Sequence, residues 1–219
     1  MKQWKLISIM MIIFAAAVVF YAKTGVIRVG VAVERIVANS DKDGDGILDA
    51  DDIVQGARQE VKNKTKYKDA YYAGGYPPDG EGVCTDVVWR ALKNAGYDLK
   101  TLMDQDILQN TKSYPRVAGT PDPNIDFRRV KNQFVFFQRH ATSLTTEIIP
   151  GDPENLKEWQ GGDIVITDIP DHVAIVSDKR NWQGVPYVIH NARRRASEDD
   201  CLVSWNKHII GHFRFPPVK

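Results

Sequence analysis

The sequence predicts a mixed fold in which helices are followed by an antiparallel sheet. Apolar residues recur at helical spacing after Cys84, and the pattern ends at Gly96, a natural helix stop. Three apolar runs with the character of strands follow at residues 163–167, 171–178 and 186–191. Gly184 marks a turn between the last two runs, so we expect these two strands to be antiparallel neighbours.

The composition fits one folded domain with attachments. The chain has 219 residues, of which 43% are hydrophobic and 26% charged, which excludes disorder throughout. Lys and Arg total 29 against 28 Asp and Glu, a net charge of +1, so we expect no nucleic-acid partner. Two cysteines are too few for a disulfide framework or a four-cysteine zinc site.

The N-terminus carries an apolar segment behind two lysines. Leu6–Ala22 contains no charged residue and reaches the shortest length that crosses a membrane. We expect residues 1–22 to be an uncleaved signal anchor, a transmembrane helix that leaves its basic end in the cytoplasm. A cleaved signal peptide is the alternative, although Phe20 fits the −3 position poorly. Residues 23–40 would form a short stalk on the outer side.

An acidic loop at residues 41–52 fits the calcium-binding loop of EF-hand proteins. Carboxylates occupy positions 1, 3, 5, 9 and 12 of the pattern, and glycine occupies position 6. A hard cation needs six to eight oxygens, and the glycine permits the sharp turn that brings them together. The predicted ligands are the side chains of Asp41, Asp43, Asp45, Asp49 and Asp52 and the backbone carbonyl of Ile47.

Two features of this loop predict weak Ca²⁺ binding. Position 12 is Asp52 rather than the longer Glu, and no second loop is present to pair with it. We therefore expect affinity on the order of 10⁻⁴–10⁻³ M, with a structural or regulatory role. The alternative is a solvated acidic turn that caps the next helix, expected at Ile53–Lys66.

Cys84 lies where a loop rich in Gly and Pro becomes a helix. A helix N-terminus favours the thiolate, which is the nucleophilic form of cysteine. A small buried apolar cysteine is the alternative for this residue alone. His172 opens the second strand and His190 ends the third, so antiparallel pairing brings both to one end of the sheet. A base oriented by a second polar residue, facing a cysteine, is what nucleophilic catalysis needs.

Several separated motifs resemble known families. Tyr72-x-Gly-Gly, Cys84, the Gly-Asp-Ile-Val strand, His172-Val-Ala-Ile and Val-Ile-His190 look like the NlpC/P60 cysteine peptidases. Gly-Val-Cys84-Thr-Asp-Val-Val, Pro-Asp-Pro-Asn-Ile-Asp126-Phe-Arg-Arg-Val and His172-Val-Ala-Ile-Val-Ser-Asp more closely resemble the bacterial domain-of-unknown-function 1287 family, over residues 53–215. The resemblance implies a papain-like α+β fold, with the cysteine helix packed on the antiparallel sheet.

The same resemblance implies residue roles. Cys84 would be the nucleophile, His172 the base and His190 the orienting third member of the triad. Tyr72 matches a tyrosine that lines the NlpC/P60 site and could donate to the oxyanion, although plain aromatic packing is the alternative. The motif departs from NlpC/P60 at Val83-Cys84-Thr85-Asp86, where the family has Asp-Cys-Ser-Gly, and a long insertion at 97–160 precedes the sheet. We therefore expect the cleft and its substrate to differ from those of the NlpC/P60 peptidases.

The predicted function is a membrane-anchored thiol hydrolase outside the cytoplasmic membrane. Its domain, residues 53–219, would cleave an amide bond in peptidoglycan peptides through an acyl-enzyme on Cys84. A non-catalytic module that binds a wall peptide or a partner, stabilised by calcium, is the alternative. A zinc hydrolase built on Cys84, Asp171, His172 and His190 is a third reading.

Three further interpretations stay open in the sequence. Cys201 could form a disulfide with Cys84 in an oxidising compartment, which would block the nucleophile. A charged lip that reads a carboxylate could form from Asn124, Asp126, Arg128 and Arg129. A buried network that pins the loop is the favoured alternative for these four side chains.

Overall fold

The computed structural model describes residues 30–36, 38–117 and 119–217. The predicted signal anchor at residues 1–22 lies outside this part of the chain. Within the described ranges, no helix has the length and apolar character needed to cross a membrane.

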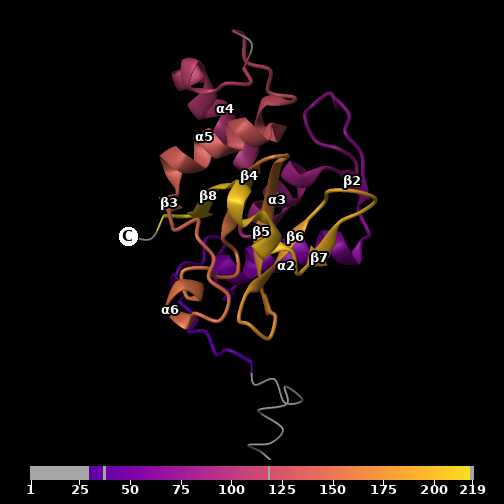
Figure 1. The fold of residues 1–219 in the computed structure, drawn as a ribbon. Helices are drawn as coiled ribbons and strands as arrows, with labels where there is room; N and C mark the ends of the chain where they lie inside the picture. Colours follow the sequence, from indigo (N-terminus) through magenta and orange to yellow (C-terminus); the bar gives the residue numbers. More distant parts are fainter. Residues whose placement is uncertain (1–29, 37, 118, 218–219) are drawn as a thin grey trace, which may run out of the picture.

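A six-stranded antiparallel sheet forms the centre of the domain (Figure 1), with the strand order β3-β8-β4-β5-β6-β7. Its strands are β3 (Thr142–Ser143), β4 (Ile164–Asp168), β5 (Asp171–Arg180), β6 (Pro186–His190), β7 (Ser197–Asp199) and β8 (Ile209–Arg214). A separate short parallel pair consists of β1 (Lys66–Tyr67) and β2 (Glu81–Gly82).

The helices fall into two groups by the face of the sheet that they cover. The long helices are α2 (Asp49–Lys62), α3 (Cys84–Asn94), α4 (Leu99–Asn110) and α5 (Val130–His140). They share one core with one face of the sheet, and Figure 1 shows α4 and α5 together at the top of the view. The short helices α6 (Pro153–Leu156) and α7 (Leu202–Trp205) contribute to a second core on the opposite face.

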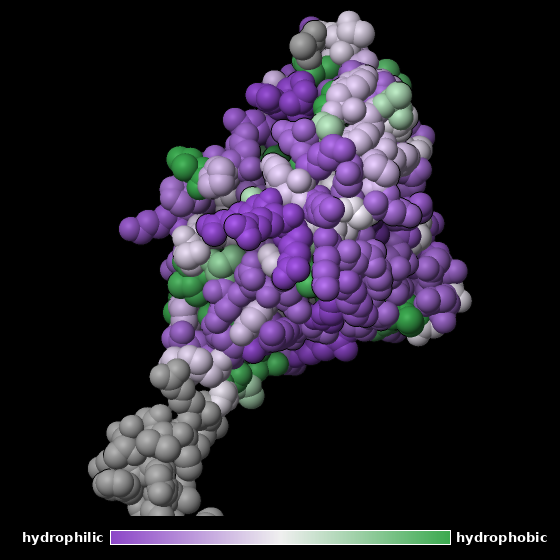
Figure 2. Space-filling view, turned by 90° about the vertical axis from the view of Figure 1, so that its right-hand side faces the viewer, coloured by the Kyte–Doolittle hydropathy of each residue, from purple (hydrophilic) through white to green (hydrophobic). Residues whose placement is uncertain are grey.

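Alternation along the central strand explains the two cores. Val173 and Ile175 of β5 belong to the core of the long helices, whereas Ala174 and Val176 belong to the second core. Successive side chains of a strand point to opposite faces, so a continuous apolar run serves both sides of a sheet buried between layers. The outer surface is polar by contrast: on the face in Figure 2, hydrophilic residues predominate and hydrophobic ones occur in small separate groups.

The predicted α+β class is confirmed, and most predicted elements occur with shifted ends. The helix after Cys84 is α3, and the three predicted strands are β4, β5 and β6 in an antiparallel arrangement. The helix predicted at Ile53–Lys66 instead spans Asp49–Lys62. It starts early because carboxylates in its first turn favour the positive helix end, and it stops before Lys64, whose φ of 54° is not helical.

A close approach joins the first two long helices. A Cβ atom added at Gly56 of α2 would lie 2.6 Å from the Asn94 Cβ atom and 2.9 Å from the Ala91 Cα atom of α3. Only glycine allows the two backbones to come this near. The contact fixes the position of α3, which carries Cys84 at its opposite end.

Candidate active site

Cys84 is the first residue of α3, and a buried ion pair fixes this start of the helix. The Asp86 carboxylate accepts hydrogen bonds from the Val83 backbone N–H (2.7 Å) and from the Trp89 indole (2.9 Å). Arg128 donates to both oxygens of Asp86, at 2.8 and 2.9 Å, and both side chains are inaccessible to solvent. A buried ion pair therefore holds the first turn of α3, where Cys84 lies.

A relay of three side chains lies above the cysteine. His172 Nε2 and His190 Nδ1 are 2.7 Å apart, and His190 Nε2 is 3.0 Å from Asp199 Oδ2. Ser197 Oγ donates to the same Asp199 oxygen at 2.6 Å. His172 and His190 are buried, whereas Asp199 is half exposed. The structure thus brings the two predicted histidines together and adds an aspartate that the sequence reading did not include.

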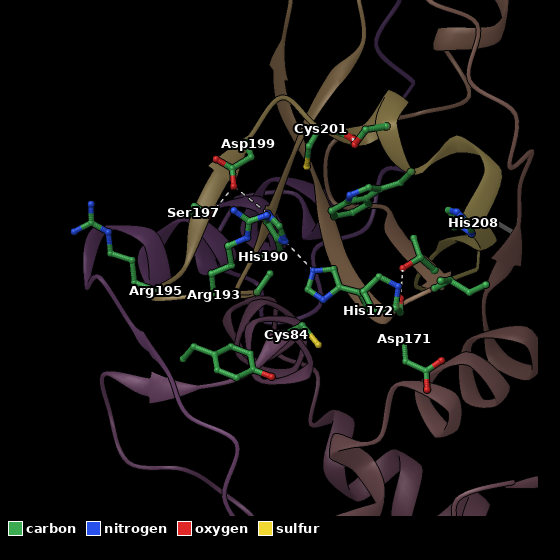
Figure 3. Close-up of a pocket in the computed structure, with 17 residues that line it drawn as sticks. Cys84, Asp171, His172, His190, Arg193, Arg195, Ser197, Asp199, Cys201 and His208 are labelled. Carbon is green, nitrogen blue, oxygen red and sulfur yellow. Dashed lines mark hydrogen bonds and ion pairs between the residues drawn. The ribbon is translucent and has the colours of Figure 1, made fainter.

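The relay assigns the protons on both imidazoles. An ionised Asp199 only accepts, so the proton of neutral His190 must lie on Nε2. His190 Nδ1 is then an acceptor, and His172 must donate to it from Nε2. The remaining nitrogen of His172, Nδ1, carries a free lone pair. Figure 3 shows this second ring nitrogen of His172 on the side where the Cys84 sulfur lies.

Burial favours the neutral forms of the His172 imidazole and the Cys84 thiol. Burial lowers the pKa of His172 to about 3, with a further contribution from the charge of His190. Burial also raises the pKa of the Cys84 thiol to about 11, against the opposing effect of the Val173 and Thr85 backbone N–H groups. This shift opposes the thiolate expected at the helix N-terminus, because desolvation of the buried sulfur outweighs the neighbouring backbone N–H groups. A neutral imidazole facing a neutral thiol is arranged for general-base chemistry.

Both imidazoles and the thiol line one cavity of about 670 Å³ (Figure 3). The Trp205 ring packs edge-on against His172 and His190, with centroids 5.4 and 5.3 Å away. Arg193 and Arg195 line the same cavity. The relay is therefore packed against an aromatic wall, in a cavity lined by Arg193 and Arg195 together with Asp171 and Asp199.

Cys201 lines the same cavity as Cys84, and both thiols are free. The alternative in which the two cysteines form a disulfide is wrong for this structure. Burial, together with Asp199 and Asp200, raises the pKa of the Cys201 thiol. Cys201 therefore serves as part of the cavity wall.

Tyr72 lies elsewhere than its predicted role requires. It is absent from the residues that line the cavity, its hydroxyl is 3.4 Å from Glu81 Oε2, and the Arg128 guanidinium stacks over its ring at 5.1 Å. Tyr67, in strand β1, lines the cavity instead. Aromatic packing, the stated alternative for Tyr72, describes its environment better than substrate contact does.

The predicted charged lip separates into two kinds of residue. Asn124 accepts from the Gly74 backbone N–H at 2.8 Å, Asp126 accepts from the Asp122 backbone N–H at 2.7 Å, and Arg128 pairs with Asp86. These three side chains form the loop-pinning network. Arg129 differs, because its Nε atom is buried and has no hydrogen-bond partner among the described residues.

Arg129 lines a second, basic cavity on the other side of Cys84. This cavity has a volume of about 240 Å³, and Arg116 and Lys131 also line it. Cys84, Tyr67 and Asp171 line both cavities, so the thiol lies between them. The side chains present here can accept an anionic group next to the sulfur.

The zinc reading is not supported in the described part of the chain. There, the one group of three or more His, Cys, Asp or Glu side chains close enough to share a metal ion is Asp41, Asp43 and Asp45. Cys84, Asp171, His172 and His190 do not form such a group. Of the predicted calcium ligands, the carboxylates of Asp41, Asp43 and Asp45 converge, whereas Asp49 and Asp52 lie outside this group, in the first turn of α2.

Comparison with known proteins identifies the domain that holds this site. A family model described as "Domain of unknown function (DUF1287)" matches residues 54–215. The chain belongs to the DUF1287 family. It is similar to "Uncharacterized protein YijF" of Escherichia coli (strain K12), with 38% identity over 172 residues, which cover 74% of this chain and 80% of YijF. All residues of the relay lie within the matched DUF1287 range, whereas the acidic loop at 41–52 precedes it.

The DUF1287 chain holds one site residue that the sequence concealed. Asp199 lies in β7, a strand of only three residues, and the register pairs Ser197 with His190. Strands this short leave no periodic signal. The acidic run Glu198–Asp200 after a predicted strand is the one hint in the sequence, and only a hairpin with β6 would place it beside His190.

Proposed function

We propose that this DUF1287 chain is a papain-like cysteine hydrolase that cleaves an amide bond in cell-wall peptides. The observation that carries the proposal is the relay from Asp199 through His190 to His172, which leaves the unprotonated Nδ1 of His172 on the side of Cys84. Nucleophile, base and orienting groups are the components that a thiol acyl transfer needs.

The proposed reaction uses His172 as a shuttle for one proton. His172 Nδ1 takes the thiol proton as the sulfur attacks the amide carbonyl carbon. Collapse of the tetrahedral intermediate breaks the C–N bond, the leaving amine takes that proton, and a thioester remains on Cys84. Water then attacks the thioester, His172 takes a proton from the water, and the sulfur recovers it as the acid product leaves. Backbone N–H groups at the start of α3 have no intrahelical partners and would donate to the oxyanion.

The charges around the thiol support a substrate that carries carboxylates. Arg193 and Arg195 share one cavity with Asp171 and Asp199, whereas in the other cavity the basic side chains, Arg116 and Arg129 among them, outnumber the carboxylates Asp69 and Asp171. The buried Arg129 Nε atom lacks a partner, and a substrate carboxylate would supply one. Cell-wall peptides have several carboxylates, which is why we favour them over neutral amides.

The proposed location is the outer side of the cytoplasmic membrane. Residues 1–22 would anchor the chain by a single transmembrane helix, with the DUF1287 domain exported. The basic residues before the apolar segment support this orientation. The substrate would then lie in the same compartment as the site.

Digestion of purified peptidoglycan tests the proposed function. The full-length protein in detergent micelles is expected to release peptide fragments with new amino termini, identified by mass spectrometry. Cys84→Ala and His172→Ala are expected to release none while keeping the circular dichroism spectrum of the parent. Equal release by Cys84→Ala would remove the thiol mechanism.

A non-catalytic binding module is the second candidate, and the neutral state of the thiol favours it. Cys84 is only 7% exposed and its pKa is raised to about 11, properties of a structural cysteine. Iodoacetamide labelling followed by peptide mapping separates the candidates. A hydrolase predicts that Cys84 reacts faster than Cys201 and that His172→Ala abolishes this difference, whereas a binding module predicts no dependence on His172.

A further inference from the structure

We propose that residues 41–52 bind one calcium ion, and that the ion fastens the start of α2 to the end of α3. This site is separate from the relay and does not depend on the proposed hydrolase activity. It rests on the arrangement of the loop and on one buried oxygen that lacks a partner.

Three carboxylates converge at the tip of the loop. One oxygen each of Asp41, Asp43 and Asp45 lies within 4.8 Å of the others, and all three residues are exposed. The Gly44 and Gly46 backbone N–H groups donate to the two oxygens of Asp41, at 2.7 and 2.9 Å. Convergent exposed carboxylates repel one another, so on their own they do not establish a site.

Asp52 supplies the independent observation. The residue is 3% exposed, and its Oδ2 atom is buried with no hydrogen-bond partner in the described structure. The charges of Asp45, Asp43, Asp41 and Asp49, all of the same sign, act on its carboxylate, so it lies within electrostatic reach of the loop tip. A buried carboxylate oxygen that lacks a partner and is acted on by further like charges is costly unless a cation balances them.

These groups match the requirements of calcium. Asp41, Asp43, Asp45 and Asp52 supply carboxylate oxygens, the Ile47 backbone carbonyl adds another, and water would complete the six to eight that calcium takes. Magnesium demands a tighter octahedron and keeps its waters, which suits an open loop with one buried ligand less well. We therefore assign calcium as the ion.

Asp49, predicted as a ligand at position 9, has another role. Its Oδ1 accepts from the Lys42 backbone N–H at 2.7 Å, and its Oδ2 accepts from the Tyr97 hydroxyl at 2.6 Å. Both oxygens are thus already used. Asp49 holds the loop on Tyr97, and we remove it from the set of direct ligands.

The loop lies against the C-terminal end of α3. A Cβ atom at Gly96 would be 3.1 Å from the Asp43 Cβ atom, and the Asn94 side-chain amide donates to the Asp52 backbone carbonyl at 2.9 Å. An ion held by Asp43 and Asp52 therefore joins α2 to the end of the helix whose first residue is Cys84. Calcium is expected to stabilise this corner of the domain.

Calorimetry and thermal unfolding of the full-length protein in detergent micelles, first stripped with a chelator, test the proposal. We expect one calcium ion per chain with a dissociation constant of about 10⁻⁴–10⁻³ M, a higher Tm with calcium, and a smaller rise with magnesium. Asp41→Asn is expected to weaken binding by about tenfold or more. The control is Asp51→Asn, which removes a carboxylate of α2 that pairs with Arg35. This variant is expected to bind calcium as the parent does.

Asp52→Asn gives a second, distinct readout. Removal of the buried charge is expected to raise the Tm in chelator and to abolish the response to calcium. The proposal fails if the parent shows no saturable binding at about 10 mM calcium. It also fails if Asp41→Asn keeps the parent's calcium response, or if Asp52→Asn lowers the Tm in chelator and still responds to calcium.

Discussion

Asp199 determines which nitrogen of His172 is free, although it bonds to His190 and not to His172 itself. Its carboxylate can only accept, and this constraint passes through His190 to fix the proton of His172 on Nε2. A hydrogen-bond donor at position 199 would reverse both imidazoles. The proposed base role of His172 therefore depends on Asp199, which reaches it only through His190.

Asp199→Asn tests this dependence. The amide can donate to His190 Nε2, which would place the proton of His172 on Nδ1 and remove the base. We expect kcat for peptide cleavage to fall by about 10²-fold or more, with little change in KM. Asp200→Asn is the matched control, because Asp200 pairs with Asn181 and lies outside the relay. An equal loss in both variants would show that the acidic run acts only through the fold.

The pKa of His172 predicts an unusual pH dependence. Because its pKa is lowered to about 3 in the folded protein, the base is expected to stay unprotonated well below pH 6.5. The acidic limb of kcat/KM is then displaced below the ordinary imidazole range. An acidic limb at pH 6 to 7 would instead indicate a charged resting imidazole.

The lowered pKa of His172 also makes the free energy of unfolding depend on pH. The unfolded chain binds a proton at His172 near pH 6.5, whereas the folded chain does so only near pH 3. The free energy of unfolding is therefore full above pH 6.5 and falls as the pH drops from 6.5 toward 3. Urea denaturation across this range is expected to show a shallower decline for His172→Gln.

At the scale of elements, α3 is placed by contacts at both of its ends. The Asp86–Arg128 pair fixes its start, and the Gly56 contact with α2 fixes its C-terminal half. Gly56→Ala is expected to force the helices apart and to lower the free energy of unfolding by about 1–3 kcal/mol, measured in urea. Gln55→Ala, an exposed neighbour on α2, is the control and is expected to change it little. If Gly56→Ala left the free energy of unfolding unchanged, the two helices would be able to move apart at no cost.

The sequence predicted those elements whose signals are local. The apolar spacing after Cys84 and the runs that became β4, β5 and β6 are long enough to show a period or a continuous apolar character. The strands β7 and β8 were not predicted. A three-residue strand such as β7 forms only by pairing with its neighbour, so Asp199, which lies in it, was not predicted either. The neutral thiol was also missed, since burial of Cys84 follows from tertiary packing.

At the scale of the whole molecule, residues far apart in the chain meet at one place. Cys84 comes from the start of a helix, while His172, His190 and Asp199 come from three neighbouring strands of the sheet. The acidic loop lies at the far end of α3, outside the range that the DUF1287 model matches. Calcium would thus act on the packing of the domain and leave the relay itself unchanged.

Detection of the acyl-enzyme tests most directly whether Cys84 is the nucleophile. The full-length protein is mixed with purified cell-wall peptides, quenched in acid within the first turnovers, and digested for mass spectrometry. A hydrolase that acts through Cys84 is expected to carry a peptide acyl group on the Cys84-containing fragment and none on the Cys201 fragment, and Cys84→Ala is expected to carry none. Cleavage of the same peptides without any adduct on Cys84, or cleavage that persists in Cys84→Ala, would contradict it.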